Sequence, residues 1–221
     1  MSAYYFSFPL DAKLQQTLDD LLTNHAKGQY ADASVPVTLA VGTTDGVIKA
    51  LALDVIDILK TNGEGAGVLG MLANLLKSTM HTLIKQIMGK VSNAEQDKLA
   101  GYLSRRRVMV NGAARFGFSM PDAIGSRFES VLKRIAAGDM TNSREDLTSA
   151  MNDFINLSTA CFYDEFTGAL DLGFVKQKMV SMGRSAILKG SQSAVAKLFV
   201  SMSDDDLKRV CAHYDSMFVK A

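Results

Sequence analysis

The chain has no tryptophan and contains only three prolines and two cysteines among its 221 residues. Because proline is the strongest helix breaker, its scarcity favours helical structure. The cysteines, Cys161 and Cys211, have hydrophobic neighbours and no CxxC spacing. We therefore expect reduced core thiols in a cytoplasmic protein rather than disulfides. A chain of this length buries roughly 70% of its unfolded surface, so it needs no disulfide or metal for stability.

The chain also lacks an excess of charge and long apolar runs. Its formal net charge is +1, which argues against nucleic-acid binding driven by electrostatics. No stretch reaches about 18 uninterrupted apolar residues, so we predict no transmembrane helix. The N-terminus has no basic region followed by a long apolar run, so we expect no secretion signal.

Familiar catalytic and metal-binding patterns are missing. There is no GxSxG motif and no HExxH spacing, and His25, His81 and His213 are far apart in the sequence. We therefore predict no metal site and favour a non-enzymatic protein. Asp54 and Asp164 would form a carboxylate pair only if they faced each other across a symmetry axis. An enzyme whose site is assembled from scattered residues stays open.

One segment, Gly65–Gly70, matches the GxGxxG pattern of dinucleotide sites. Such glycines act at a tight turn between a strand and a helix. No alternation of strands and helices surrounds the segment, and the second half of the chain has no equivalent glycines. We interpret it as a flexible connector between helices and predict no cofactor.

The most informative feature present is a likeness between the two halves of the chain. At an offset of about 110 residues, Phe6-Ser7-Phe8 falls on Phe116-Gly117-Phe118. Further identical residues recur at the same offset, including Asp54 with Asp164. Apolar residues match as well, since Leu14, Leu18 and Leu22 correspond to Ile124, Phe128 and Leu132 at helical spacing.

These patterns predict a mainly α-helical protein of two tandem, similar halves, residues 1–112 and 113–221, packed about an approximate two-fold axis. One compact globular unit is the alternative. Gly42 and Gly46 predict a helix that begins only near Thr44 or Asp45. Gly183 and Gly190 predict two short helices in place of one long helix.

The junction of the halves carries the one predicted β feature. Asn111-Gly112 between apolar runs favours a hairpin that pairs 108–110 with 115–118, and the aromatic segment 4–8 is expected to join it. Arg105, Arg106 and Arg107, with Arg115 across the turn, form the densest basic cluster and are the candidate anion- or partner-binding residues. Alternatively, these arginines end a helix and complement its dipole.

Twelve methionines and the absence of a catalytic pattern lead to the first functional hypothesis, a protein-binding or adaptor module with an apolar groove. The partner expected for such a module is another protein. The alternative is a carrier or sensor that holds a small apolar or amphipathic ligand inside the helical bundle. That alternative requires a cavity, for which we expect several hundred cubic ångströms.

Overall fold

The computed structural model describes residues 3–59, 65–89 and 91–220 and is mainly helical. The elements of the first half are β1 (Tyr4–Phe8), α1 (Ala12–Ala26), α2 (Ser34–Ile48), the π-helical η1 (Lys49–Leu53), α3 (Asp54–Leu59), α4 (Gly65–Ile87), α5 (Asn93–Arg106) and β2 (Arg107–Val110). Those of the second half are β3 (Ala113–Met120), α6 (Asp122–Ala136), α7 (Ser143–Ser158), the π-helical η2 (Thr159–Asp164), α8 (Glu165–Gly168), α9 (Phe174–Ser201), α10 (Asp204–Asp215) and β4 (Phe218–Lys220).

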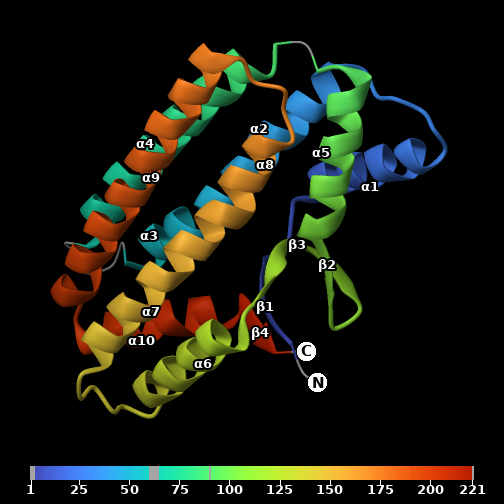
Figure 1. Cartoon of the computed structure of the whole chain (residues 1–221). Coiled ribbons are helices and arrows are strands. Elements are labelled where there is room, and N and C mark those ends of the chain that lie inside the picture. Colours follow the sequence, from blue (N-terminus) through green and yellow to red (C-terminus); the bar gives the residue numbers. More distant parts are fainter. Residues whose placement is uncertain (1–2, 60–64, 90, 221) are drawn as a thin grey trace.

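The long helices α4 and α9 run side by side along one edge of the molecule, and α7 lies next to them (Figure 1). Helices α1 and α5 lie toward the opposite side, and α6 and α10 pack together near the small sheet. Each α-helix buries one apolar face, and those faces meet in a hydrophobic core that contains residues from both halves. Among the described residues, no helix is both long and apolar enough to cross a membrane.

The sheet is antiparallel, with strand order β2-β3-β1-β4. In the central pair Ser7 lies opposite Gly117. A Cβ atom on Gly117 would lie only 1.9 Å from the carbonyl oxygen of Phe6, so this close approach requires glycine. Phe6 and Phe118 pack against Phe154 of α7, with ring centroids 4.8 and 6.0 Å away. The sheet is thereby attached to the helical layer.

The predicted hairpin is confirmed, although the paired segments are 107–110 and 113–116 rather than 108–110 and 115–118. Asn111 and Gly112 have φ angles of 50° and 79° and connect β2 to β3, as a two-residue turn of this type requires. The aromatic segment 4–8 joins the sheet as β1, as expected. The last strand, β4, was not predicted, since three residues carry too little periodicity to identify a strand.

Two predicted helix interruptions are wrong. Helix α2 starts at Ser34 and runs through Gly42 and Gly46, and α9 is continuous through Gly183 and Gly190. At all four positions a Cβ atom would approach a neighbouring side chain to 3.0 Å or less. These glycines leave room for the tip of a packed side chain, and tertiary packing offsets their poor helix propensity.

Local capping signals agree with the structure. Asp11 accepts a hydrogen bond from the amide of Leu14 at the start of α1. Ser92 and Glu95 form the reciprocal capping box of α5. Ser203 accepts from the amide of Asp206 at the start of α10. Each cap satisfies an amide that the helix leaves free, and this is why short sequence patterns locate these helix starts.

Candidate functional site

A cavity of about 160 Å³ lies inside the helical bundle, between α2, α4, α5, α7 and α9. Most of its wall is aliphatic or aromatic and comes from both halves of the chain. Representative wall residues are Leu39, Leu76, Leu99, Phe116, Phe162 and Ile187. The cavity is smaller than the several hundred cubic ångströms expected for an internal ligand site. It matches in size an engineered apolar cavity of about 150 Å³ that binds benzene.

The cavity reaches the surface beside the end of α1, where His25 and the exposed Gln29 line it. His25 Nε2 lies 2.8 Å from a carboxylate oxygen of Asp97 on α5. The side chain of Gln96 accepts from the backbone amide of Ala31 and donates to its carbonyl, at 3.0 and 3.1 Å. These contacts hold the loop after α1 against α5, so the position of the opening is fixed by polar contacts.

Most hydroxyl groups along the cavity wall already have partners. Thr43 donates to the carbonyl of Leu39 at 2.7 Å, and Ser158 donates to that of Ile155 at 3.1 Å. Tyr163 donates to the carbonyl of Val180 at 2.7 Å. Burial raises the pKa of Tyr163 to about 12, so its phenol stays protonated at neutral pH. These groups are neutral and engaged with the backbone.

Three hydroxyl groups on the wall are exceptions: that of the partly exposed Thr44, and those of the buried Thr159 and Ser191. Thr159, at the start of η2, is 5% exposed, and Ser191 of α9 is 8% exposed. Neither side chain has a hydrogen-bond partner within the described part of the chain. Both residues line the cavity, on helical segments that pack against each other. The cavity therefore contains hydrogen-bonding capacity that the protein itself leaves unused.

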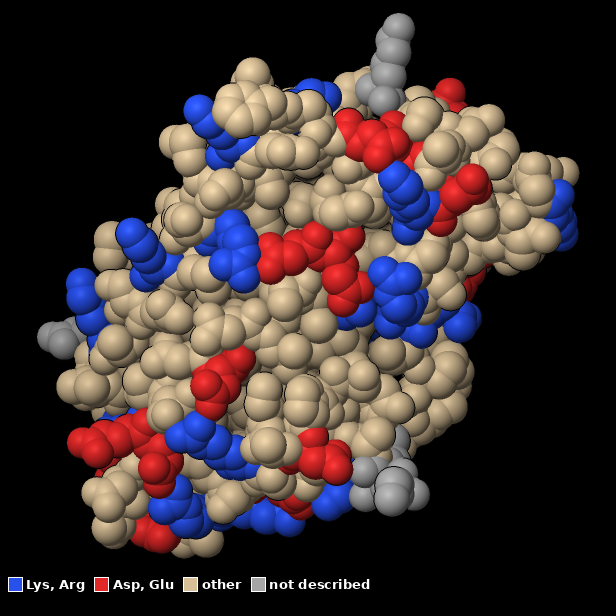
Figure 2. All heavy atoms as spheres, viewed as in Figure 1, with Lys and Arg blue, Asp and Glu red and all other residues tan. Residues whose placement is uncertain are grey.

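No lysine, arginine, aspartate or glutamate is present among the described residues that line the cavity. Charged side chains lie on the outside instead. In Figure 2 basic and acidic groups are interspersed over the visible face, without a large patch of one sign. An ionised ligand inside the cavity would lose its hydration without gaining a counter-charge, which is strongly unfavourable. The interior therefore suits a neutral molecule.

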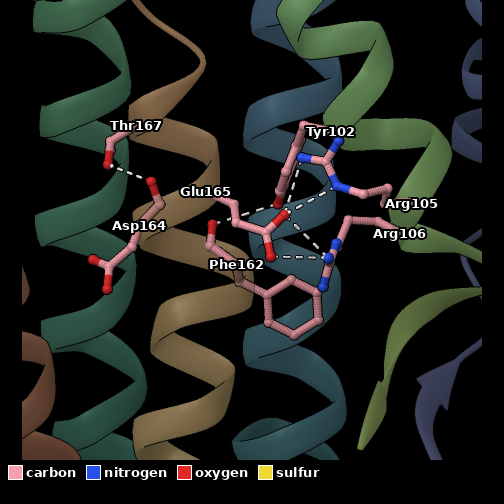
Figure 3. Close-up of polar contacts among 7 residues, drawn as sticks. All are labelled: Tyr102, Arg105, Arg106, Phe162, Asp164, Glu165 and Thr167. Atoms are coloured by element: carbon pink, nitrogen blue, oxygen red, sulfur yellow. Dashed lines mark hydrogen bonds and ion pairs between the residues drawn. The ribbon is translucent and has the colours of Figure 1, made fainter.

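A charged cluster lies beside Tyr102 and Phe162 (Figure 3), two residues that line the cavity. Nη2 of Arg106 contacts both carboxylate oxygens of Glu165, at 3.1 and 3.2 Å. Arg105 donates to the same carboxylate through Nε and Nη2. The guanidinium of Arg106 is also within 6 Å of the ring centroids of Tyr102 and Phe118. This cluster connects α5 to α8, across the junction of the two halves.

Arg106 is only 5% exposed, and its Nε and Nη1 have no hydrogen-bond partner in the described residues. The thiol of Cys161 lies beside it, and burial raises the pKa of that thiol despite the nearby positive charge. Burial also raises the pKa of Tyr102. The cluster therefore presents a protonated thiol and a protonated phenol, so it offers no activated nucleophile.

The four predicted anion- or partner-binding arginines do not form one site. Arg105 and Arg106 share Glu165, whereas Arg107 donates to Asp19 of α1 at 2.7 Å. Arg115 donates to the backbone carbonyls of Ser7 and Ser216, at 2.7 and 3.3 Å. Each arginine thus makes internal contacts, and binding of an external anion stays a prediction.

Other residues singled out in the sequence are also apart from one another. Asp54 pairs with Lys49, and Asp164 pairs with Arg184. The interpretation of Gly65–Gly70 as a flexible connector is wrong, because these residues form the start of α4, and no strand comes directly before them among the described residues. The part of the chain that the structure describes contains no group of three or more side chains able to hold a metal ion.

The three histidines each have a different partner. Besides His25, His81 Nε2 lies 2.8 Å from Asp45, and His213 Nε2 lies 2.8 Å from the carbonyl oxygen of Ala50. All three contacts join elements distant in sequence, which is consistent with structural histidines.

Neither the place of the cavity nor the unpartnered hydroxyls of Thr159 and Ser191 could be identified from the sequence. The available signal was that Thr159 and Ser191 interrupt apolar positions of buried helical segments, but hydroxyls at such positions usually bond to the preceding turn. Only the structure distinguishes a satisfied hydroxyl from a free one. No protein-family model, curated protein or solved structure matches this chain.

Proposed function

We propose that this protein is a carrier or sensor of a small apolar ligand, which it holds in the cavity of the helical bundle. The observation that carries the proposal is the cavity itself, with its largely apolar wall and its opening beside His25. Apolar cavities of this size bind small hydrocarbons because the ligand regains the dispersion contacts that the empty wall lacks.

The arrangement of the wall also supports binding rather than catalysis. Tyr102 and Tyr163 are held in their neutral forms by burial, and their hydroxyls donate to backbone carbonyls. Catalysis by acid and base groups needs a side chain that titrates near the working pH and reaches the substrate. Most of the described wall residues supply shape and apolar surface instead, and the imidazole among them, His25, contacts Asp97 at the opening.

Native mass spectrometry of freshly purified protein, compared with the denatured protein, tests this proposal. An added mass that disappears on denaturation identifies a bound small molecule. If the protein carries no added mass, the purified protein is titrated with benzene and binding is measured by calorimetry. Failure to carry a ligand and to bind benzene would refute the proposal.

A second candidate function is protein binding, which is favoured by exposed apolar side chains on α4 and α9. Met71 is 69% exposed, Met182 is 73% exposed and Phe174 is 71% exposed. These helices pack along each other at the edge of the molecule, and an exposed apolar patch there would be typical of an interaction site. Capture of a cellular protein by the wild-type chain, abolished by Met71→Lys and Met182→Lys, would support this function. Capture unaffected by both changes would count against it.

We also infer that the two halves descend from one duplicated unit. Both halves run strand, helix, helix, π-helical segment, short helix, long helix, helix, strand. Ser7 and Gly117, equivalent at an offset of 110, lie opposite each other, with Phe6 opposite Phe118 and Phe8 opposite Phe116. A two-fold axis through the central pair would exchange these partners. Superposition of one half on the other in a crystal structure should need a rotation near 180°, and a very different rotation would contradict the inference.

A further inference from the structure

We infer that the ligand of the cavity is a neutral molecule of about the size of a single aromatic ring that carries one hydrogen-bonding group, and that this group binds the hydroxyls of Thr159 and Ser191. The inference rests on the proposed carrier or sensor function and specifies its ligand. It follows from three properties of the cavity: its unused hydroxyls, its volume and its lack of charge.

The hydroxyls of Thr159 and Ser191 have the features of a binding position. Both residues are more than nine-tenths buried, and neither has a partner among the described residues. The side-chain oxygen of Ser7 is also unpartnered, but the surrounding protein seals it completely. The hydroxyls of Thr159 and Ser191 are not among the sealed atoms, and both residues line the cavity. A ligand atom inside the cavity can therefore reach them.

The two residues lie on facing segments of the wall. Near them, Gln192 of α9 donates to Asn156 of α7 at 3.5 Å, and Arg184 of α9 donates to Asp164 of η2 at 2.8 Å. These two contacts fix the alignment of α9 against α7 and η2. Thr159 and Ser191 fall within the same interval of that alignment, so one small polar group can interact with both sides.

The chemistry of a hydroxyl determines which ligand groups fit. Threonine and serine side chains each donate one hydrogen bond and accept others. They can therefore bind a carbonyl by donating to it, a ring N–H by accepting from it, and an alcohol or a phenol in either way. A carboxylate, phosphate or ammonium group does not fit, because the described wall residues include no lysine, arginine, aspartate or glutamate and burial of an unpaired charge is very costly.

Arg106 does not change this conclusion. Its unpartnered nitrogens, Nε and Nη1, are sealed by the surrounding protein, and the residue is not part of the cavity wall. Its charge is also paired with Glu165. An anionic ligand would have to displace the protein around this guanidinium before it could bind there.

The test compares phenol with benzene, since the two probes differ by one hydroxyl group. Binding of each is measured by isothermal titration calorimetry to the full-length wild type, Thr159→Val and Ser191→Ala. Thr43→Val is the matched control, because Thr43 also lines the cavity and is 6% exposed, but its hydroxyl already donates to the carbonyl of Leu39.

We expect the wild-type protein to bind phenol more tightly than benzene. The ratio of the two affinities should be roughly 2- to 10-fold larger in the wild type than in Thr159→Val, which is the contribution of one net hydrogen bond. Ser191→Ala should reduce the preference in the same way, and Thr43→Val should leave it unchanged. Benzene affinity should change little in all three variants.

The outcomes separate the two proposals. If benzene and phenol both fail to bind, the carrier or sensor function is wrong. If benzene binds but phenol has no advantage, or if Thr159→Val and Ser191→Ala retain the full preference for phenol, the function stands and the inferred polar recognition is wrong. Circular dichroism of each variant establishes that a lost preference does not come from unfolding.

Discussion

Filling the cavity should stabilise the ligand-free protein and abolish ligand binding. Ala40 of α2 lines the cavity and is 8% exposed. Ala40→Leu adds three carbon atoms at the edge of an empty space. In a close-packed core the same change forces neighbouring side chains apart. The sign of the stability change therefore reports whether the space exists.

The magnitude follows from the added apolar surface. Burial of three carbons at about 0.8 kcal/mol each contributes about 2.4 kcal/mol. Restricting the leucine rotamers costs about 0.5–1 kcal/mol. The expected net stabilisation is about 1.5–2 kcal/mol, which corresponds to an increase in Tm of about 3–8 °C for a domain of this size.

Thermal unfolding followed by circular dichroism measures this change, and Ala100→Leu is the matched control. Ala100 is 3% exposed and does not line the cavity, so its replacement should destabilise the protein by about 1–3 kcal/mol. Benzene should raise the Tm of the wild type but not that of Ala40→Leu. If Ala40→Leu is destabilised as much as Ala100→Leu, the region around Ala40 is fully packed and the reasoning is refuted.

Three further predictions concern charges and thiols. Glu165→Gln should destabilise the protein by about 2 kcal/mol, which is less than for a fully buried pair because Glu165 is 36% exposed. Asp153→Asn breaks an exposed pair and should cost below about 1 kcal/mol. Chemical denaturation measures both changes, and equal effects would contradict the role of burial. Hydrogen bonds from a lysine and a tyrosine lower the pKa of Glu129 from 4.5 to about 2, so its stabilisation is complete above its unfolded pKa and disappears as the pH falls through the folded value. The Tm difference between wild type and Glu129→Gln should therefore shrink in acid, and a constant difference would disprove the linkage. Burial raises the pKa of Cys161, and raises that of Cys211 to about 12, so iodoacetamide should alkylate both thiols only after denaturation; rapid labelling of the native protein would show that they are accessible.

Local signals in the sequence predicted helix starts and the hairpin because a few neighbouring residues determine them. The hydroxyl of Ser92 and the turn at Asn111-Gly112 act within their own segments. Helix continuity through Gly42 and Gly183 depends instead on which distant side chain occupies the space, Leu14 in one case and Tyr163 in the other. A single sequence contains no record of such pairs, so glycine was interpreted as a break.

The candidate site was less predictable for the same reason. The basic cluster was identified, but the partner of Arg106, Glu165, is separated from it by 59 positions. The cavity is a property of packing between five helices, and no local pattern specifies the space that packed side chains leave empty. In the sequence Thr159 is an ordinary helical threonine. It points to a binding position only because its hydroxyl has no hydrogen-bond partner among the described residues.

A crystal structure determined under xenon pressure would show whether the bundle contains an accessible apolar cavity. Xenon enters apolar cavities of this size without needing a specific polar contact. We expect an ordered xenon atom inside the bundle, in contact with side chains such as Leu39, Phe116 and Phe162 that line the cavity. A well-ordered structure without xenon at that position, with the same side chains closing the space, would contradict the account.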